Sequence, residues 1–305
     1  MVQTVLYIVG FVIKWVYEKF VEFDILWRFI YMKKKLINVL IFFLVFFGFL
    51  LLSRSRIEAL LVEHSVNSHL NVNPDEFEAN LETETEFYFD VIDSIELGVI
   101  LDAIGTEVSA VGEVIIPSVG IHLPIFHGTT NATLSLGAGT MTPDQRMGFG
   151  NYSLASHRML VPDQLFTPLD HAEIGERIFL RDAEYVYIYE ITEWEIIHQT
   201  RVDVIDYVEG ETLVTLITCA EHDLDYRILV RGEFIEQILI EELYDMAEVD
   251  DDLENVFEAI STPMESSNFE LILRIGGIVL IAALLGLFAV WFTPKKKKKS
   301  SRYRR

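Results

Sequence analysis

The stretch Thr215-Leu216-Ile217-Thr218-Cys219 carries the only cysteine among the 305 residues of this chain. The residues that lead into it, from Glu211 onward, are mostly β-branched or apolar, which predicts a strand that enters a buried core. Polar residues follow the cysteine, and a second strand is predicted to begin at Tyr226. The sequence thus places a thiol at the end of a core strand, where a substrate can reach it. The alternative is a buried cysteine that serves only for packing.

Two other segments supply the groups that a cysteine nucleophile needs. The alternating pattern of residues 151–156 predicts a strand with His157 at its end, and Arg227 opens the strand after Cys219. The thiolate is the reactive form of cysteine, and an imidazole can transfer protons near neutral pH. A guanidinium is always charged and can stabilise an oxyanion. Cys219, His157 and Arg227 are therefore the predicted catalytic residues.

These residues resemble the sortases, the membrane-anchored cysteine transpeptidases of Gram-positive bacteria. The family signature Thr-Leu-x-Thr-Cys corresponds to residues 215–219, and both the histidine context and the arginine context match. The resemblance covers roughly residues 98–240 in the expected order. Further matching segments are Ile116-Pro117, Leu123-Pro124-Ile125-Phe126-His127-Gly128, Gly137-Ala138-Gly139-Thr140 and Leu165-Phe166-Thr167-Pro168-Leu169.

The resemblance implies an all-β fold, the sortase-type eight-stranded β-barrel with short helices, over residues 98–243. Short apolar runs separated by Gly, Pro and polar turns independently favour an all-β barrel or sandwich there. The implied activity is that of a cysteine transpeptidase or hydrolase. It would cleave an LPxTG-type sorting signal between Thr and Gly through a thioacyl-enzyme on Cys219. The acceptor would be an amine of a cell-wall precursor, with His157 exchanging protons and Arg227 stabilising the oxyanion.

Two alternative functions stay open. The Gly150–His157 context and the eight-residue gap from Cys219 to Arg227 look like class A sortases, the housekeeping enzymes. Two membrane segments look like class C, the pilin polymerases, which use a lysine of a pilin as acceptor. Class C enzymes usually carry an Asp-Pro-aromatic lid, and Asn73-Pro74-Asp75 does not fit it. The second alternative is a membrane-tethered β-domain that binds peptides without catalysis.

Two apolar segments flank the predicted barrel. Residues 36–52 follow Lys33-Lys34-Lys35, and residues 271–292 precede five consecutive lysines. Both are long enough for transmembrane helices, which need roughly 17–25 residues. Lysine clusters favour the cytoplasmic side. We therefore expect a two-pass protein of the cell membrane with an extracellular catalytic domain and both termini in the cytoplasm. Residues 1–35 are predicted to be an amphipathic or disordered cytoplasmic segment, and residues 293–305 a basic cytoplasmic tail.

Charge is distributed very unevenly along the chain, whose formal net charge is −23. Between Glu58 and Glu270 there are 44 acidic residues, seven arginines and no lysine. Residues 53–97 and 244–270 are predicted to be acidic linkers. Within the first of them, residues 57–63 can continue as a helix and residues 71–86 form a solvated spacer. No cofactor is expected; calcium is conceivable, but no spacing matches a calcium loop. The basic tail lies beside a predicted membrane span, so it indicates topology and contact with lipid and not binding of nucleic acid.

Overall fold

The computed structural model describes residues 54–70, 76–81, 85–87, 97–106, 108–220, 225–247 and 250–261, together with short stretches between residues 14 and 51. Those short stretches are helical and belong to a separate unit from residues 54–270. The predicted basic tail, residues 293–305, lies outside the described residues.

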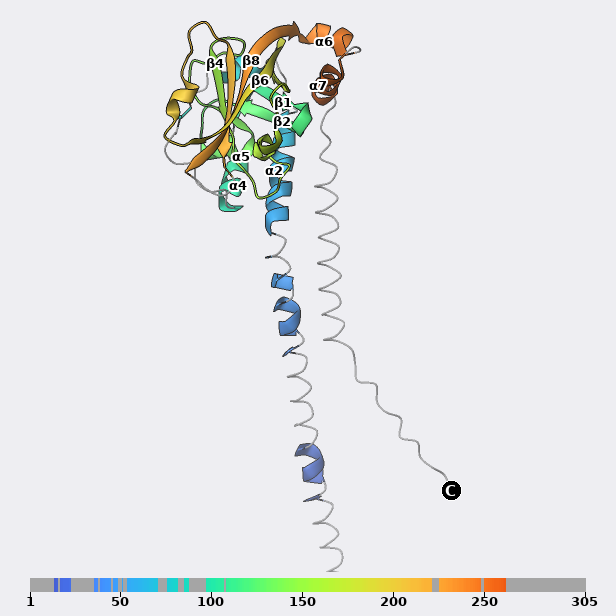
Figure 1. Cartoon of the computed structure of the whole chain (residues 1–305). Coiled ribbons are helices and arrows are strands. Elements are labelled where there is room, and N and C mark those ends of the chain that lie inside the picture. The colour runs from blue at the N-terminus through green and yellow to red at the C-terminus, as the bar shows by residue number, and fades with distance from the viewer. Residues whose placement is uncertain are drawn as a thin grey trace, which may run out of the picture. The chain divides into compact units, whose positions relative to one another are not determined.

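Eight strands form a closed barrel, which confirms the predicted eight-stranded β-barrel (Figure 1). Their order around the barrel is β1-β2-β3-β4-β7-β8-β6-β5. The pairs β2–β3 and β4–β7 are parallel, and the other pairs are antiparallel. The strands are β1 (Ala110–Ile116), β2 (Ile121–Phe126), β3 (Ala138–Thr140), β4 (Asn151–Ala155), β5 (Arg177–Arg181), β6 (Tyr185–His198), β7 (Leu213–Cys219) and β8 (Tyr226–Leu239).

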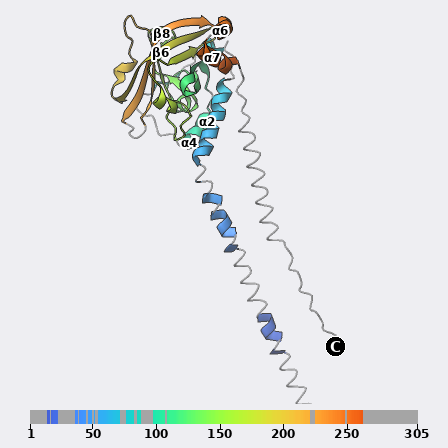
Figure 2. The same cartoon turned by 45° about the vertical axis from the view of Figure 1, so that its right-hand side comes forward.

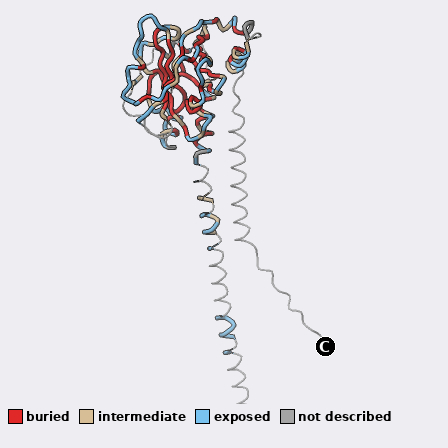
Figure 3. The backbone as a smooth tube through the Cα atoms, in the orientation of Figure 1, coloured by how far each residue is buried: buried red, intermediate tan, exposed pale blue. Residues whose placement is uncertain are grey.

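The period of two residues along β7 divides its side chains between two sides of the barrel wall. Val214 and Leu216 belong to the main core inside the barrel. Ile217 packs in a smaller cluster with Leu229 of β8. Cys219 shares the face of Ile217, because the two residues are two positions apart. Figure 3 shows the buried residues concentrated in the strands of the barrel.

Three helices that were predicted as linker or linker border pack on the barrel domain instead. They are α2 (Arg54–Leu70), α3 (Phe77–Leu81) and α4 (Leu97–Ile104). In α2 the apolar side chains of Ala59, Val62 and Val66 recur at helical spacing and are buried. Gln164 donates a hydrogen bond to the carbonyl of Ala59, at 2.6 Å. Figure 2 shows α2 beside α4, and the two helices are in contact. The part of the predicted linker that could continue as a helix, residues 57–63, is therefore helical within α2, and the helix packs on the barrel domain.

The segment after β8 also differs from the predicted linker. It forms α6 (Ile240–Ala247) and α7 (Asp251–Ser261). The buried side chains of Leu253 and Val256 pack in a second core cluster with residues of β5 and β6. Asp250 accepts backbone N–H groups at the start of α7 and a 2.6 Å hydrogen bond from Arg177 of β5. This segment is mostly acidic, so its sequence was interpreted as a linker. The few apolar residues of α7 nevertheless occupy one face of an amphipathic helix.

Removing one of those apolar contacts should measurably destabilise the domain. We expect Leu253→Ala to lower the free energy of unfolding by about 2–4 kcal/mol, because Leu253 is 3% exposed within a packed cluster. Glu254→Ala is the matched control, since Glu254 is exposed on the same helix. Urea unfolding of both variants checks this. Equal stability of the two variants would mean that α7 does not pack on the barrel in solution.

The predicted membrane segments cannot be compared with this structure in full. Residues 271–292 lie outside the described residues, and residues 36–52 are described only in part. Within the ranges that are described, no helix is both long enough and apolar enough to cross a bilayer.

The other short helices are α5 (Asn131–Leu136), η2 (Pro117–Val119), η3 (Thr167–His171) and η4 (Val202–Ile205). Among them, α5 begins at a capping box formed by Thr130 and Thr133. The helix η4 lies between β6 and β7 and contributes to the site described next.

Candidate active site

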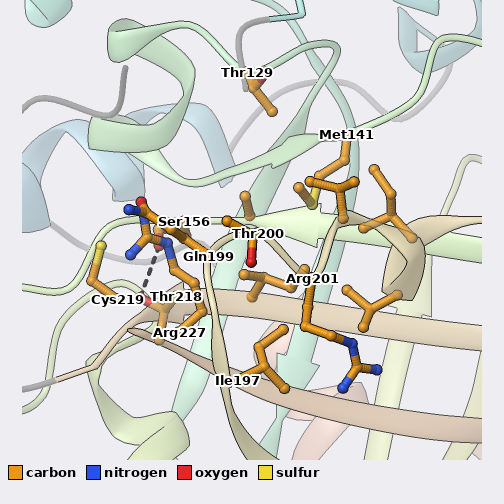
Figure 4. Close-up of a pocket in the computed structure, with 15 residues that line it drawn as sticks. Thr129, Met141, Ser156, Ile197, Gln199, Thr200, Arg201, Thr218, Cys219 and Arg227 are labelled. Atoms are coloured by element: carbon orange, nitrogen blue, oxygen red, sulfur yellow. Dashed lines mark hydrogen bonds between the residues drawn. The ribbon is translucent and has the colours of Figure 1, made fainter. Parts of the chain in front are cut away.

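Cys219 is the last residue of β7 and the first residue of that strand that is not fully buried. The six residues before it are buried, so they fix the position of the strand end. The thiol lines a cavity of about 510 Å³ (Figure 4). Cys219 is thus partly accessible at a rigid position. Cys219 is therefore not a buried cysteine that serves only for packing.

Both threonines of the signature fasten β7 to β4. Thr215 donates a hydrogen bond to the side-chain oxygen of Asn151 at 2.7 Å. Thr218 donates to the backbone oxygen of Ser156 at 2.9 Å, which is the dashed line in Figure 4. Both hydroxyl groups are buried, where an unmade hydrogen bond would be costly. The motif therefore holds the strand that ends in Cys219 against the strand that leads to His157.

Arg227 lies directly opposite Cys219 in the antiparallel pair of β7 and β8. Side chains of opposed residues stand on the same face of a sheet, so the thiol and the guanidinium share one surface. The Nη1 of Arg227 donates to the backbone oxygen of Tyr226 at 3.0 Å. Its Nη2 donates to Oε1 of Gln199 at 3.3 Å. The cation therefore points into the same cavity from a fixed strand position.

His157 follows directly on the β4 strand, which runs parallel to β7. The register pairs Ala155 with Ile217, so we expect the backbone of His157, two residues further on, at the level of Cys219. The backbone N–H of Ser156 donates to Ile217 O at 3.2 Å, which supports this continuation. The ring itself is 3% exposed and is not part of the cavity lining. Among the described residues, its Nε2 has no hydrogen-bond partner.

Burial lowers the pKa of His157 to about 4. The imidazole is therefore neutral at pH 7 and available to accept a proton. The sequence placed the residue at a strand end but did not reveal this burial, which depends on packing from other parts of the chain.

The lowered pKa of His157 makes a prediction about stability. Because the unfolded chain takes up a proton near pH 6.5 and the folded chain only near pH 4, this residue destabilises the fold as pH falls between those values. We expect wild type to lose about 2–3 kcal/mol more unfolding free energy between pH 7 and pH 4.5 than His157→Gln does. Urea unfolding at both pH values measures this difference. Equal losses would show that the pKa of His157 is not lowered.

The cavity has a mainly polar end and a mainly apolar end, and Arg201 lies on the mainly apolar side in Figure 4. In the view of Figure 4, Cys219 and Arg227 lie toward one side and Met141 toward the other. A volume of about 510 Å³ is within the usual range for a ligand pocket. The apolar lining comes from β4, β6, β7, the 3-10 helix η4 and the residue after β3: Met141, Ala155, Ile197, Val202, Val204, Ile205 and Ile217.

Buried and partly buried hydrogen bonds hold η4 over the sheet. Asn151 donates to the backbone oxygens of Val204 at 2.9 Å and Asp206 at 3.1 Å. Arg231 of β8 donates to the same Val204 oxygen at 3.1 Å and is paired with Glu193 at 2.7 Å. The loop that carries the apolar lining is therefore anchored at its base to two strands, β4 and β8. The sequence analysis did not single out these anchors.

No group of three or more His, Cys, Asp or Glu side chains within the described part of the chain could hold a metal ion. His222, which follows Cys219 by three residues in the sequence, lies outside the described residues.

Comparison with known proteins identifies the family. The family model described as "Sortase domain" matches residues 114–235. Sortase A of Streptococcus agalactiae is 35% identical over 204 residues, which cover 64% of this chain and 83% of that relative. This chain belongs to the sortase family. The sortase A of Listeria monocytogenes is 44% identical over 111 residues, covering 36% of this chain and 50% of that protein.

A solved structure of the Listeria monocytogenes sortase A is also similar to this sortase. It has 37% sequence identity and a TM-score of 0.43, and the match covers 48% of this chain and 96% of that one. The sortases are cysteine transpeptidases, so this chain is one as well. The signature that carried the resemblance lies within the matched residues, as do Cys219, His157 and Arg227.

Proposed function

We propose that this sortase cleaves an LPxTG-type sorting signal between Thr and Gly and transfers the new acyl group to an amine of a cell-wall precursor. The observation that carries the proposal is the strand register that sets Cys219 opposite Arg227 at the polar end of one cavity. A nucleophile and a fixed cation on one surface can act on the same carbonyl group. The apolar end of the cavity suits the Leu and Pro side chains that precede the scissile bond.

The proposed chemistry starts from a neutral His157. As the sulfur of Cys219 attacks the Thr carbonyl carbon, the imidazole accepts the thiol proton. Arg227 stabilises the resulting oxyanion. The C–N bond then breaks, and the imidazolium returns its proton to the departing glycine amine. In the second half, the incoming amine attacks the thioester and gives a proton to His157, which passes it to the leaving sulfur. The covalent intermediate thus divides one amide exchange into two steps.

Trapping the thioester tests the proposal. The full chain in detergent is mixed with an LPxTG peptide without an acceptor amine, and the protein mass is measured by mass spectrometry. We expect Cys219 to gain the mass of the acyl fragment that ends in Thr, with release of the Gly fragment. A peptide of scrambled order is the control. The proposed substrate would be contradicted if Cys219 is not acylated and no Gly fragment is released. It would also be contradicted if both peptides acylate Cys219 alike.

The identity of the acceptor amine needs a separate experiment. Two predicted membrane segments are also typical of class C sortases, which use a lysine of a pilin as acceptor. A cell-wall-type peptide amine and a pilin-type peptide with an internal lysine compete for the same thioester. We expect the product with the cell-wall amine to dominate. Dominance of the lysine product would favour the pilin polymerase instead.

We also propose that the protein crosses the membrane twice and exposes its catalytic domain outside the cytoplasm. Two apolar segments with adjacent lysine clusters support this topology. Helical residues in the first of them are more than half exposed, including Leu40, Phe43 and Phe47. Because Cys219 is the only cysteine, a membrane-impermeant thiol reagent should label it in intact cells. In a Cys219→Ala background, Ser301→Cys should be labelled only after lysis. Labelling of Ser301→Cys in intact cells would contradict the topology.

A further inference from the structure

Gln199 bridges the cation of the site to a carboxylate. It follows β6 directly, and its backbone N–H donates to the backbone oxygen of Asp225 at 2.8 Å. Its side-chain Nε2 donates to Oδ1 of Asp225 at 2.9 Å, and its Oε1 accepts from Nη2 of Arg227 at 3.3 Å. Both halves of the amide are therefore engaged.

The register of the strands explains why these groups meet. In the β6–β8 pair, Ile197 is opposite Arg227 and His198 is opposite Tyr226. Gln199 therefore falls opposite Asp225, one residue beyond the ladder. Alternation along the strand puts Gln199 on the face of Ile197, which is also the face of Arg227 and Cys219. The amide thus reaches the guanidinium from the neighbouring strand.

The partners on either side fix the orientation of the amide. A guanidinium offers only donors and an ionised carboxylate offers only acceptors. The Gln199 oxygen must therefore face Arg227, and its nitrogen must face Asp225. A rotation of the amide by half a turn would place its nitrogen against the donors of Arg227 and its oxygen against the acceptors of Asp225. One nitrogen of Arg227 is in this way held by a neutral acceptor of fixed position.

We propose that Gln199 is a positioning residue that aims the guanidinium of Arg227 at the Cys219 end of the cavity. The inference rests on the proposed role of Arg227 as oxyanion stabiliser. Gln199 also begins the segment that continues into η4, which supplies part of the apolar lining. Gln199 therefore adjoins a segment that lines the cavity proposed to hold the substrate.

The test replaces the amide without changing the length of the side chain. Gln199→Met should lower kcat roughly tenfold and leave KM within about twofold, because it removes an interaction that matters in the transition state. Gln199→Asn shortens the side chain by one methylene and so withdraws the amide from Arg227. This variant should likewise lower kcat and leave KM nearly unchanged. His198→Gln is the control, since His198 is an exposed neighbour on the other face of the strand. It should retain wild-type kcat and KM.

Repeating the substitution in an Arg227→Lys background distinguishes positioning from other roles. If Gln199 acts through Arg227, Gln199→Met should slow thioester formation there by less than threefold. An equal fold-loss in both backgrounds, or an increase of KM alone, would overturn the inference and leave the proposed function standing. Near-normal activity of Arg227→Lys by itself would instead refute the role of Arg227, and the inference with it.

Discussion

Cys219→Ala is expected to abolish thioester formation and to reduce turnover by at least about three powers of ten. No other residue of the chain offers a thiol. The position at the end of β7 is fixed by six buried residues, so another side chain cannot move into the same place without disturbing the core. The measurement is the rate of release of the Gly fragment from an LPxTG peptide, with the acylated protein followed by mass spectrometry.

The substitution should leave the fold intact. Cys219 is partly exposed, and the two threonines that fasten its strand are retained. Thermal unfolding of Cys219→Ala should therefore match wild type within a few degrees. Thr218→Val is a useful contrast, because it keeps the thiol but removes the 2.9 Å hydrogen bond to Ser156. Peptide cleavage by a stable Cys219→Ala variant would show that this thiol is not the nucleophile.

Arg227→Lys should lower kcat by two to three powers of ten, although it keeps the positive charge. The guanidinium uses separate nitrogens for Tyr226 and Gln199, and it carries five N–H donors in a planar fork. An ammonium on a flexible stem cannot reproduce that fork, so its charge is not held at the developing oxyanion. Steady-state kinetics with the same peptide would measure the loss.

The control for this prediction is Arg146→Lys, which changes an exposed arginine in the segment between β3 and β4. That variant should behave as wild type, because Arg146 does not line the cavity. If Arg227→Lys keeps kcat within a fewfold of wild type, its guanidinium does not stabilise the transition state. A rise in KM without a fall in kcat would assign Arg227 to substrate binding alone.

Local patterns in the sequence predicted the barrel and the end of β7 well. The β-branched run before Cys219 and the polar residues after it gave the strand and its end, and the structure has β7 over Leu213–Cys219. Local patterns failed where charge outweighed periodicity. In α7 the buried residues are few, and the acidic residues between them concealed the helical spacing, so that segment was interpreted as an acidic linker. In α2 the sequence indicated helix only over residues 57–63, whereas the structure has helix over Arg54–Leu70.

Contacts between distant strands could not be predicted in the same way. Gln199 and Arg227 are 28 residues apart, and their hydrogen bond depends on the register of β6 and β8. That register includes two shifts along the pair. The burial of His157 has the same origin, since the carbonyl of Leu134 that its backbone N–H contacts belongs to another part of the barrel domain. The residue types indicated the chemistry, and the fold determines its geometry.

The partial exposure of Cys219 affects how adjacent copies of the enzyme can react with one another. An acyl group on that sulfur would sit within reach of any primary amine that approaches the cavity. No lysine occurs between residues 36 and 294, so adjacent copies present no side-chain amine from this part of the chain to one another. The catalytic domain is in this way a poor substrate for its own ligation, even when many copies crowd together.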